Sequence, residues 1–286
     1  MLTAADIAQG RSARRQPPSL RQQYEEYVLQ RVESYKNNLT RGELLTLGDE
    51  AAGELQTSTA GQFVLTEVLM LETVDRLIMK RLRLPSYARW RKQIQALRLA
   101  QREPIHWGID SASAIVPLLA RLELDDQVLL IGGGVQAEAC LLAAYGNPVT
   151  FVDETMAAVE RLEARIAGES LAGRFLAFVA SLGDWLPPFA DPIPLVVIDA
   201  ATLAALPYAR RQSLIARAKD LTCPCGVHVL LPGESGGAAP EAYLSHYPDW
   251  VREPSGPRRG KAARSHGVVL ARPAKQVAED RLAARG

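Results

Sequence analysis

The stretch Val128–Glu154, VLLIGGGVQAEACLLAAYGNPVTFVDE, decides the fold of this chain. An apolar strand-like segment enters three consecutive glycines, a helix-like segment leaves them, and a second strand-like segment ends on Asp153. Gly132, Gly133 and Gly134 allow a ligand to approach the backbone where the next helix presents free N–H groups. An acid about twenty residues after such a turn can accept both hydroxyls of a ribose. The pattern is typical of a unit that binds a nucleotide, although a tight turn without a ligand remains open.

The alternation of strand and helix continues to about residue 231. The further strand candidates are AFVASL, PLVVIDA and VHVLLP. Such alternation predicts a parallel sheet covered by helices. Two later strand-like pieces, DWVREP and HGVVLARP, predict an antiparallel hairpin that closes the sheet.

The preceding part of the chain is helical in pattern. Apolar residues recur at helical spacing, Thr40 and Glu43 match a capping box, and Pro85 ends a long helix-like run. We therefore expect an all-helical N-terminal domain before an α/β domain. The expected divisions are a flexible polar leader over 1–19, the helical domain over 20–107, the α/β domain over 108–273 and a polar tail over 274–286.

Composition narrows the class of protein. The 286 residues are 48% hydrophobic, which can supply a substantial core. The sequence contains no apolar run of about eighteen residues, so no membrane span is expected. The N-terminal residues carry no apolar signal segment. Three cysteines supply no disulfide framework, and we expect a cytoplasmic protein.

Charge is unevenly distributed along the chain, whose net charge is +1. Residues 111–250 carry 8 basic and 16 acidic residues, a net charge of −8, between basic flanks. The stretch Arg76–Arg102 contains nine basic residues and no acid, with Tyr87 and Trp90 interleaved, and Arg258–Arg264 adds a basic loop. Basic and aromatic residues together can hold single-stranded nucleic acid. The alternative is a solvated face, or one that pairs with the acidic block.

The sequence of the glycine turn is compatible with more than one ligand. Gly132 to Ala137 fits G-x-G-x-x-A, a form of the dinucleotide fingerprint, which alone favours NAD or FAD. The downstream segments SLGDWLPPF and PLVVIDAATLAALPYARRQSLIARAKDLTCPCGVHVLLPGE favour another interpretation. Together with the terminal hairpin, they resemble the second half of class I S-adenosylmethionine (SAM)-dependent methyltransferases. The resemblance covers about residues 108–273.

This resemblance implies a Rossmann-like methyltransferase sheet with a C-terminal antiparallel hairpin, and SAM as the cofactor. The implied cofactor-binding residues are Gly132, Gly133, Gly134, Asp153, Asp184, Trp185 and Asp199. In these implied roles, Asp153 holds the ribose hydroxyls. Asp184 bonds the adenine amino group, with Trp185 beside the ring. Asp199 lines the floor near the methyl group.

The sequence also departs from the family pattern. The family usually has an acid near the end of the first strand, where this chain has Leu129, Leu130 and Ile131. The third glycine of the usual G-x-G-x-G is Gln136. A non-catalytic relative that uses the fold for binding or assembly therefore stays open, as does an NAD-dependent oxidoreductase.

His106 and Asp199 are the candidates for a catalytic role. His106 precedes the sheet domain in PIHWGID, where it could line the pocket or pack as part of a hinge. His228 lies within an apolar strand and is expected in the core. Cys223 and Cys225 cannot by themselves complete a tetrahedral zinc site, so no metal site is expected.

The favoured function is methyl transfer from SAM to a small-molecule acceptor. The helical domain is then expected to serve as a lid or as the surface of a homodimer.

Overall fold

The computed structural model describes residues 18–58, 67–233, 239–254 and 267–274. The chain divides into two compact units, Met1–Leu97 and Arg98–Gly286, here called the helical unit and the sheet unit. The basic loop Arg258–Arg264 lies outside the described residues, as do most of the predicted leader and tail.

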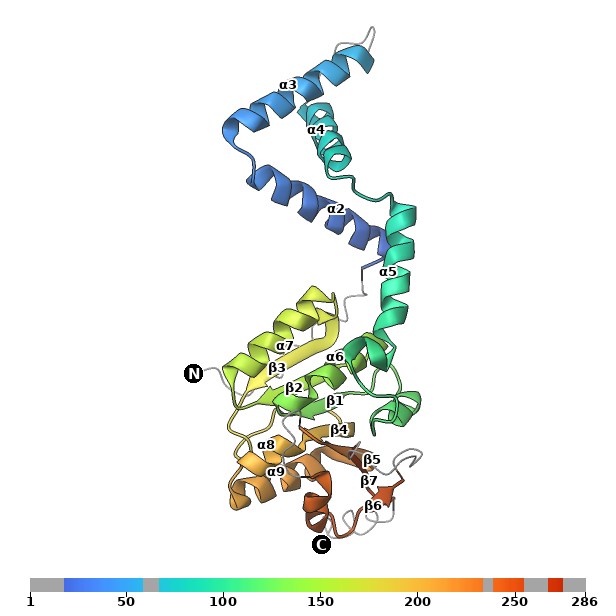
Figure 1. Cartoon of the computed structure of the whole chain (residues 1–286), viewed down its shortest axis with the longest axis vertical. Coiled ribbons are helices and arrows are strands. Elements are labelled where there is room, and N and C mark those ends of the chain that lie inside the picture. Colours follow the sequence, from blue (N-terminus) through green and yellow to red (C-terminus); the bar gives the residue numbers. More distant parts are fainter. Residues whose placement is uncertain (1–17, 59–66, 234–238, 255–266, 275–286) are drawn as a thin grey trace. The chain divides into compact units, whose positions relative to one another are not determined.

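Among its described residues, the helical unit contains the helices α2 to α5, of which α5 continues into the sheet unit (Figure 1). Their bounds are α2 Leu20–Asn37, α3 Arg41–Ser58, α4 Glu67–Arg81 and α5 Tyr87–Gln101. A small core joins α2, α3 and α4 and consists of Val32, Leu47, Ala51, Leu77 and Ile78. The prediction of an all-helical N-terminal region is confirmed for the described residues.

Two capping boxes set the starts of helices α2 and α3. At α3, the Thr40 backbone N–H donates to Glu43 Oε2 at 2.7 Å, and the Glu43 N–H donates to Thr40 Oγ1 at 3.4 Å. At α2, Ser19 and Gln22 form the same reciprocal pair. Each box satisfies backbone donors that a helix start leaves without a partner.

The sheet unit contains a seven-stranded sheet of order β3-β2-β1-β4-β5-β7-β6. Strands β1 to β5 are parallel, and β7 runs antiparallel to both of its neighbours, β5 and β6. The predicted sheet with its antiparallel C-terminal hairpin is thus confirmed. The bounds are β1 Val128–Ile131, β2 Val149–Asp153, β3 Phe175–Val179, β4 Ile193–Asp199, β5 Thr222–Leu231, β6 Val251–Glu253 and β7 Val268–Ala271.

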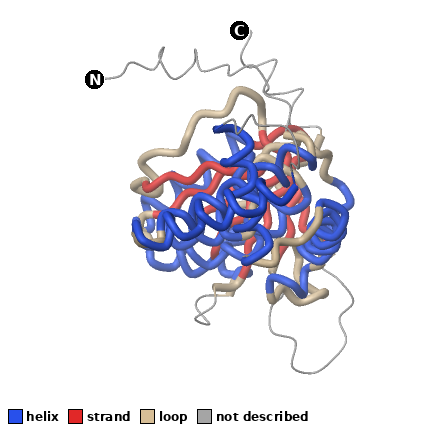
Figure 2. Tube along the Cα trace, turned by 90° about the horizontal axis from the view of Figure 1, so that it is seen from above, coloured by secondary structure: helices blue, strands red, loops and turns tan. Residues whose placement is uncertain are grey.

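Helices cover both faces of this sheet (Figures 1 and 2). One core places α6 (Gln136–Tyr145) and α7 (Met156–Gly168) against residues such as Leu130 and Phe151. The other places α8 (Ala200–Ala205) and α9 (Tyr208–Leu221) against residues such as Leu129 and Ile131. Successive β1 residues thus enter opposite cores, as the period of two in a strand requires. A strand buried on both faces must be apolar throughout, which explains VLLI.

The boundary between the units differs from the predicted one at residue 107. The end of α5 and the 3-10 helix η1 (Pro104–Trp107) belong to the sheet unit. Trp107 Nε1 donates to the Gln101 carbonyl at 2.6 Å, and Gln101 Nε2 donates to the Glu169 carbonyl at 3.0 Å. These bonds tie the end of α5 to the sheet unit, and helical periodicity alone could not reveal them.

Candidate functional site

The candidate site lies at the carboxyl ends of β1, β2 and β4. The strand order places β2 on one side of β1 and β4 on the other, so the connections reverse direction at β1. Open α/β sheets bind ligands at such a point. A pocket of about 420 Å³ lies there. It is lined by Gly133, Gly134, Gln136, Asp153, Glu154, Thr155, Ala158, Arg161, Leu182, Asp199, Ala201, Thr202 and Ala205.

The glycine turn is shaped by the chain's own side chains. Gly132 has φ +98°, which favours glycine, and a Cβ there would lie 2.8 Å from Thr202 Cβ. A Cβ on Gly134 would lie 2.8 Å from Asp199 Cγ. A Cβ on Gly133 would make only ordinary contacts, at 3.6 Å from Asp153 Oδ2. The absence of a side chain at Gly132 and Gly134 therefore makes room for Thr202 and Asp199, whereas Gly133 borders the pocket without such a neighbour.

Asp199 is the most enclosed polar group of the pocket, with 5% of its surface exposed. Its Oδ2 accepts the Gly134 N–H at 3.3 Å and the Thr202 hydroxyl at 2.9 Å. Its Oδ1 accepts the Ala201 N–H at 2.9 Å and so caps helix α8. The structure thus brings Asp199 against the glycine turn and into the lining of the pocket.

Asp153 lies at the end of β2 and faces the same pocket. Its Oδ1 accepts both the backbone N–H and the hydroxyl of Thr155, at 2.7 and 2.6 Å. Its Oδ2 lies on the side of Gly133. One carboxylate oxygen is therefore engaged locally, and the other is directed toward the space beside the glycine turn.

Glu154 and Arg161 line the pocket and were not predicted from the sequence. Glu154 pairs with Arg210 of α9, with 2.6 Å between Oε1 and Nη2. Arg210 Nη2 also donates to Ser181 Oγ at 2.7 Å. Arg161 contributes the basic group among the lining residues. Glu154 directly follows Asp153 in the sequence, but its partner is 56 residues away, so no local pattern indicates the pair.

Asp184 and Trp185 are not among the residues that line the pocket. Asp184 Oδ2 accepts the Ser181 hydroxyl at 2.6 Å and lies 3.6 Å from Arg210 Nε. Trp185 packs edge-on against Phe178, with ring centroids 5.8 Å apart. The segment that carries them is held on α9 by Gly183, whose carbonyl accepts the Ser213 hydroxyl at 2.5 Å. Leu182, from the same segment, is the residue that reaches the pocket.

His106 also lies outside the lining of the pocket. Its Nε2 is 4.0 Å from Glu169 Oε2, just beyond the carboxyl end of α7, and its ring contacts Trp107 edge-on. Helix α7 begins after the carboxyl end of β2 and runs back along the sheet. Glu169 and His106 therefore lie toward the sheet edge opposite the pocket, and the geometry assigns His106 no contact with a ligand there.

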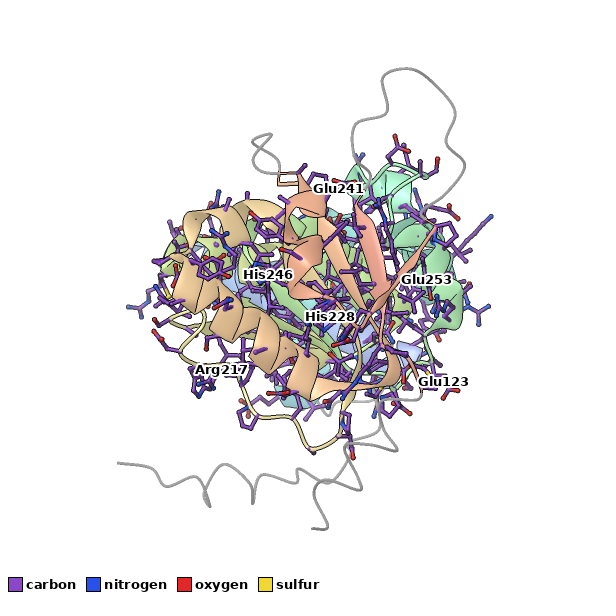
Figure 3. All side chains as sticks on the ribbon, turned by 90° about the horizontal axis from the view of Figure 1, so that it is seen from below. Glu123, Arg217, His228, Glu241, His246 and Glu253 are labelled. Carbon is purple, nitrogen blue, oxygen red and sulfur yellow. The ribbon has the colours of Figure 1, made fainter. Side chains whose placement is uncertain are left out.

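His228 is a core residue, as its apolar strand predicted, and it is labelled in Figure 3. Thr222 Oγ1 donates its proton to the Ala218 carbonyl at 2.7 Å, so His228 Nε2 must donate to Thr222 Oγ1 at 2.8 Å. His228 Nδ1 is then the acceptor for the Tyr247 hydroxyl at 2.9 Å. Burial lowers the pKa of His228 to about 3. This imidazole stays neutral and structural.

The remaining predicted features are the three cysteines and the basic stretch Arg76–Arg102. Cys140, Cys223 and Cys225 are free thiols, and no cluster of metal-binding side chains occurs in the part of the chain that the structure describes. Within Arg76–Arg102, Trp90 is 7% exposed and packs on Tyr24 and Tyr87, with centroids 5.4 Å apart for Tyr24 and 6.5 Å apart for Tyr87. Trp90 is thus an internal packing group, and the half-buried Tyr87 packs against it. Over the described ranges, no helix is both long and apolar enough to cross a membrane.

Comparison with known proteins found similarity to solved structures. No protein-family model matches the chain, and no curated protein sequence matches it significantly. The CcbJ methyltransferase from Streptomyces caelestis is 20% identical over 42% of this chain and 48% of its own, with a TM-score of 0.36. TehB from Haemophilus influenzae is 18% identical over 56% of this chain and 61% of its own, with a TM-score of 0.42. The N-methyltransferase NodS from Bradyrhizobium japonicum WM9 is 15% identical over 55% and 93%, with a TM-score of 0.41.

The present chain therefore spans about half of CcbJ and less than two thirds of TehB. Similarity at this level says nothing about the activity of the present chain. The fold is therefore identified from the chain's own sheet. The strand order and the pocket at the point of reversal identify a Rossmann-like α/β protein.

Proposed function

We propose that the pocket at the ends of β1, β2 and β4 binds SAM and that the protein is a SAM-dependent methyltransferase. The observation that carries this proposal is the charge of the pocket. Asp153, Glu154 and Asp199 line it together with one basic residue, Arg161. When bound, SAM supplies an electrophilic methyl group on a sulfonium centre.

The acidic lining favours a cationic nucleoside over a dinucleotide. A dinucleotide places its pyrophosphate on the N–H groups of the glycine turn and the following helix. Here the Gly134 N–H donates to the Asp199 carboxylate, at a Gly134–Asp199 separation that leaves no space for a Cβ. A pyrophosphate beside that carboxylate meets like-charge repulsion, whereas the sulfonium and ammonium groups of SAM meet attraction. This argues against the NAD-dependent oxidoreductase.

The placement of Asp153 supports a ribose beside Gly133. One of its oxygens is held by Thr155 and the other faces the pocket, so the carboxylate is fixed in orientation before a ligand arrives. A fixed acceptor at the end of β2 suits the two ribose hydroxyls. Leu182 supplies an apolar wall for the base. The adenine contacts of Asp184 and Trp185 stay a prediction. The Ser181 hydroxyl takes one acceptor position on Asp184 Oδ2, and the carboxylate has other positions for an amino group.

Calorimetric titration with SAM, its demethylated product S-adenosylhomocysteine (SAH) and NADH tests the proposal. We expect micromolar binding of SAM and SAH, and a loss of at least about tenfold in both on Asp153→Asn. Asp125→Asn is the matched control, because Asp125 is an exposed partner of Arg174 outside the pocket. Binding of NADH without SAM or SAH would contradict the proposal.

We further propose a small-molecule acceptor. Nucleic acid is less well supported, because the aromatic rings within Arg76–Arg102 are packed against one another and Arg76 and Arg81 pair with Glu54 and Glu50. Binding of labelled single-stranded RNA at two salt concentrations tests this choice. Affinity that falls steeply with salt would favour a nucleic-acid acceptor.

Homodimerisation through the helical unit and a cytoplasmic location stay predictions. Sedimentation velocity over a range of protein concentrations tests the first, and cell fractionation tests the second.

A non-catalytic binding protein is the second candidate, and two observations favour it. Thr202 and Asp199 occupy the space beside Gly132 and Gly134, and the described pocket lining contains no histidine. Such a protein would show no transfer of labelled methyl groups from SAM to any acceptor in a broad screen, with or without SAH binding.

A further inference from the structure

The end of strand β1 lacks the acid that the methyltransferase resemblance leads one to expect. Leu129, Leu130 and Ile131 are fully buried in the two cores of the sheet. None of these side chains can therefore reach a ligand. If the pocket binds the amino acid end of SAM, another group must accept the hydrogen bonds of its ammonium, and a carboxylate gives the strongest ones.

Strand β4 provides a carboxylate at the same place. It is the direct neighbour of β1, and its register pairs Ile131 with Ile198. Gly132 and Asp199 are the next residues of the two strands, so they lie side by side at the carboxyl edge. The contact between Gly134 N and Asp199 Oδ2, at 3.3 Å, brings this carboxylate over the turn that follows β1.

The Asp199 carboxylate keeps capacity for one further donor. A carboxylate offers about four acceptor positions, two on each oxygen. Gly134 and Thr202 donate to Oδ2, and Ala201 donates to Oδ1. One position on Oδ1 remains. A Cβ on Gly233 would lie 2.9 Å from that oxygen, so the glycine at this position leaves space on one side of Oδ1.

We infer that Asp199 is the residue that binds the ammonium group of the ligand's amino acid end, taking the place of the acid absent from β1. This inference rests on the proposed function. A carboxylate held by three donors is fixed in direction, and its charge is hardly screened at 5% exposure. Asp199 thus sets specificity for a nucleoside that carries a cationic side chain.

Helix capping alone does not account for this arrangement. Capping of the six-residue helix α8 uses only the bond from Ala201 to Oδ1, and an asparagine side chain provides that acceptor equally well. The substitution Asp199→Asn keeps the cap through its amide oxygen and removes the charge. Its amide nitrogen takes the place of Oδ2, so the Gly134 N–H also loses its acceptor, and a ligand without the amino acid is needed to report any change in the glycine turn.

The test compares two ligands that share adenosine and a thioether sulfur. SAH carries the amino acid, and 5′-methylthioadenosine lacks it. Both are titrated calorimetrically into the wild type, Asp199→Asn, Asp153→Asn and the control Asp125→Asn. We expect Asp199→Asn to weaken SAH by about 10- to 100-fold, the range for a bond to a charged group, and to change methylthioadenosine by less than about twofold. Asp153→Asn should weaken both ligands alike.

A second measurement needs only the wild type, in case Asp199→Asn lowers the melting temperature or fails to fold. A deaminated analogue of SAH, which keeps the carboxylate but has no ammonium, should bind at least about tenfold more weakly than SAH. Equal binding of SAH and this analogue overturns the inference. So does an equal loss of SAH and methylthioadenosine in Asp199→Asn, or no loss of either.

These outcomes differ from failure of the proposed function. If neither SAH nor methylthioadenosine binds the wild type, the pocket is not a SAM site, and both proposals fall. If both bind and Asp153→Asn weakens them, the proposed site stands, and the Asp199 results decide the further inference by themselves.

Discussion

Removal of one hydroxyl from the buried core of the sheet unit should cost about 2 kcal/mol of stability. The substitution is Tyr247→Phe. Tyr247 is 3% exposed, and its hydroxyl donates to Nδ1 of the fully buried His228 at 2.9 Å. The phenylalanine ring keeps the edge-on contacts with His228 and Trp250 and the approach of Lys219 to the ring face. Only the hydrogen bond is lost, and it leaves a buried acceptor without a donor.

The magnitude follows from that orphaned acceptor. His228 Nε2 is committed as a donor to Thr222, because the Thr222 proton goes to the Ala218 carbonyl. The neutral imidazole therefore has its lone pair at Nδ1, and no alternative tautomer relieves it. A buried acceptor left unsatisfied costs about 1–3 kcal/mol. For a unit of this size, 2 kcal/mol corresponds to a fall of about 4–8 °C in melting temperature.

Urea unfolding and thermal melting monitored by circular dichroism measure this effect. Tyr208→Phe is the matched control: its hydroxyl accepts from Gln212 at 2.7 Å, but the side chain is 63% exposed, so water replaces the bond. We expect a change within about 0.5 kcal/mol for the control. Equal effects of the two substitutions would refute the reasoning.

Three further predictions follow from single sites. Gly134→Ala should weaken SAH binding by at least about tenfold because its Cβ would displace the Asp199 carboxylate, whose Cγ is 2.8 Å away. Gly173→Ala, outside the pocket lining and with no atom within 4 Å of the added Cβ, should bind SAH within about threefold of the wild type in the same calorimetric assay. The folded-state pKa of His228 is lowered to about 3, so the unfolded chain binds more protons than the folded chain between that pH and 6.5, and the free energy of unfolding should fall as pH drops through this window. His228→Gln should reduce the slope of stability against pH by up to about 1.4 kcal/mol per pH unit. An unchanged slope would contradict this prediction. In the helical unit, substitution of the fully buried Leu47 by Ala should lower the free energy of unfolding by about 2–5 kcal/mol. Substitution of the 64% exposed Leu45 by Ala should lower it by about 0.5 kcal/mol. Urea unfolding followed by tryptophan fluorescence measures both values.

The fold and part of the site were predictable because their signals are local. A capping box joins residues three positions apart, and a buried parallel strand must be apolar on both faces. The glycine turn and Asp153 belong to one continuous strand–helix–strand segment. These features can be read from neighbouring residues without knowledge of the partner elements.

Other parts of the site depend on strand register and helix packing. Asp199 meets Gly134 across 65 residues of sequence, and Arg210 meets Glu154 across 56. The same long-range packing places Asp184 beside Arg210, outside the pocket lining, and places His106 beside Glu169. No local spacing distinguishes these outcomes from the ones that the family resemblance implied.

The sequence by itself determined the strands, the helix starts and the turn at which a ligand can approach, since backbone preferences and periodicity act over a few residues. Only the tertiary structure decided which carboxylate faces that turn. Gly132 and Gly134 resemble a cradle for a ligand in the sequence, yet the register of β4 against β1 fills the space beside them with Thr202 and Asp199. Contacts between distant segments depend on how the strands and helices pack, and the pocket's charge arises from those contacts.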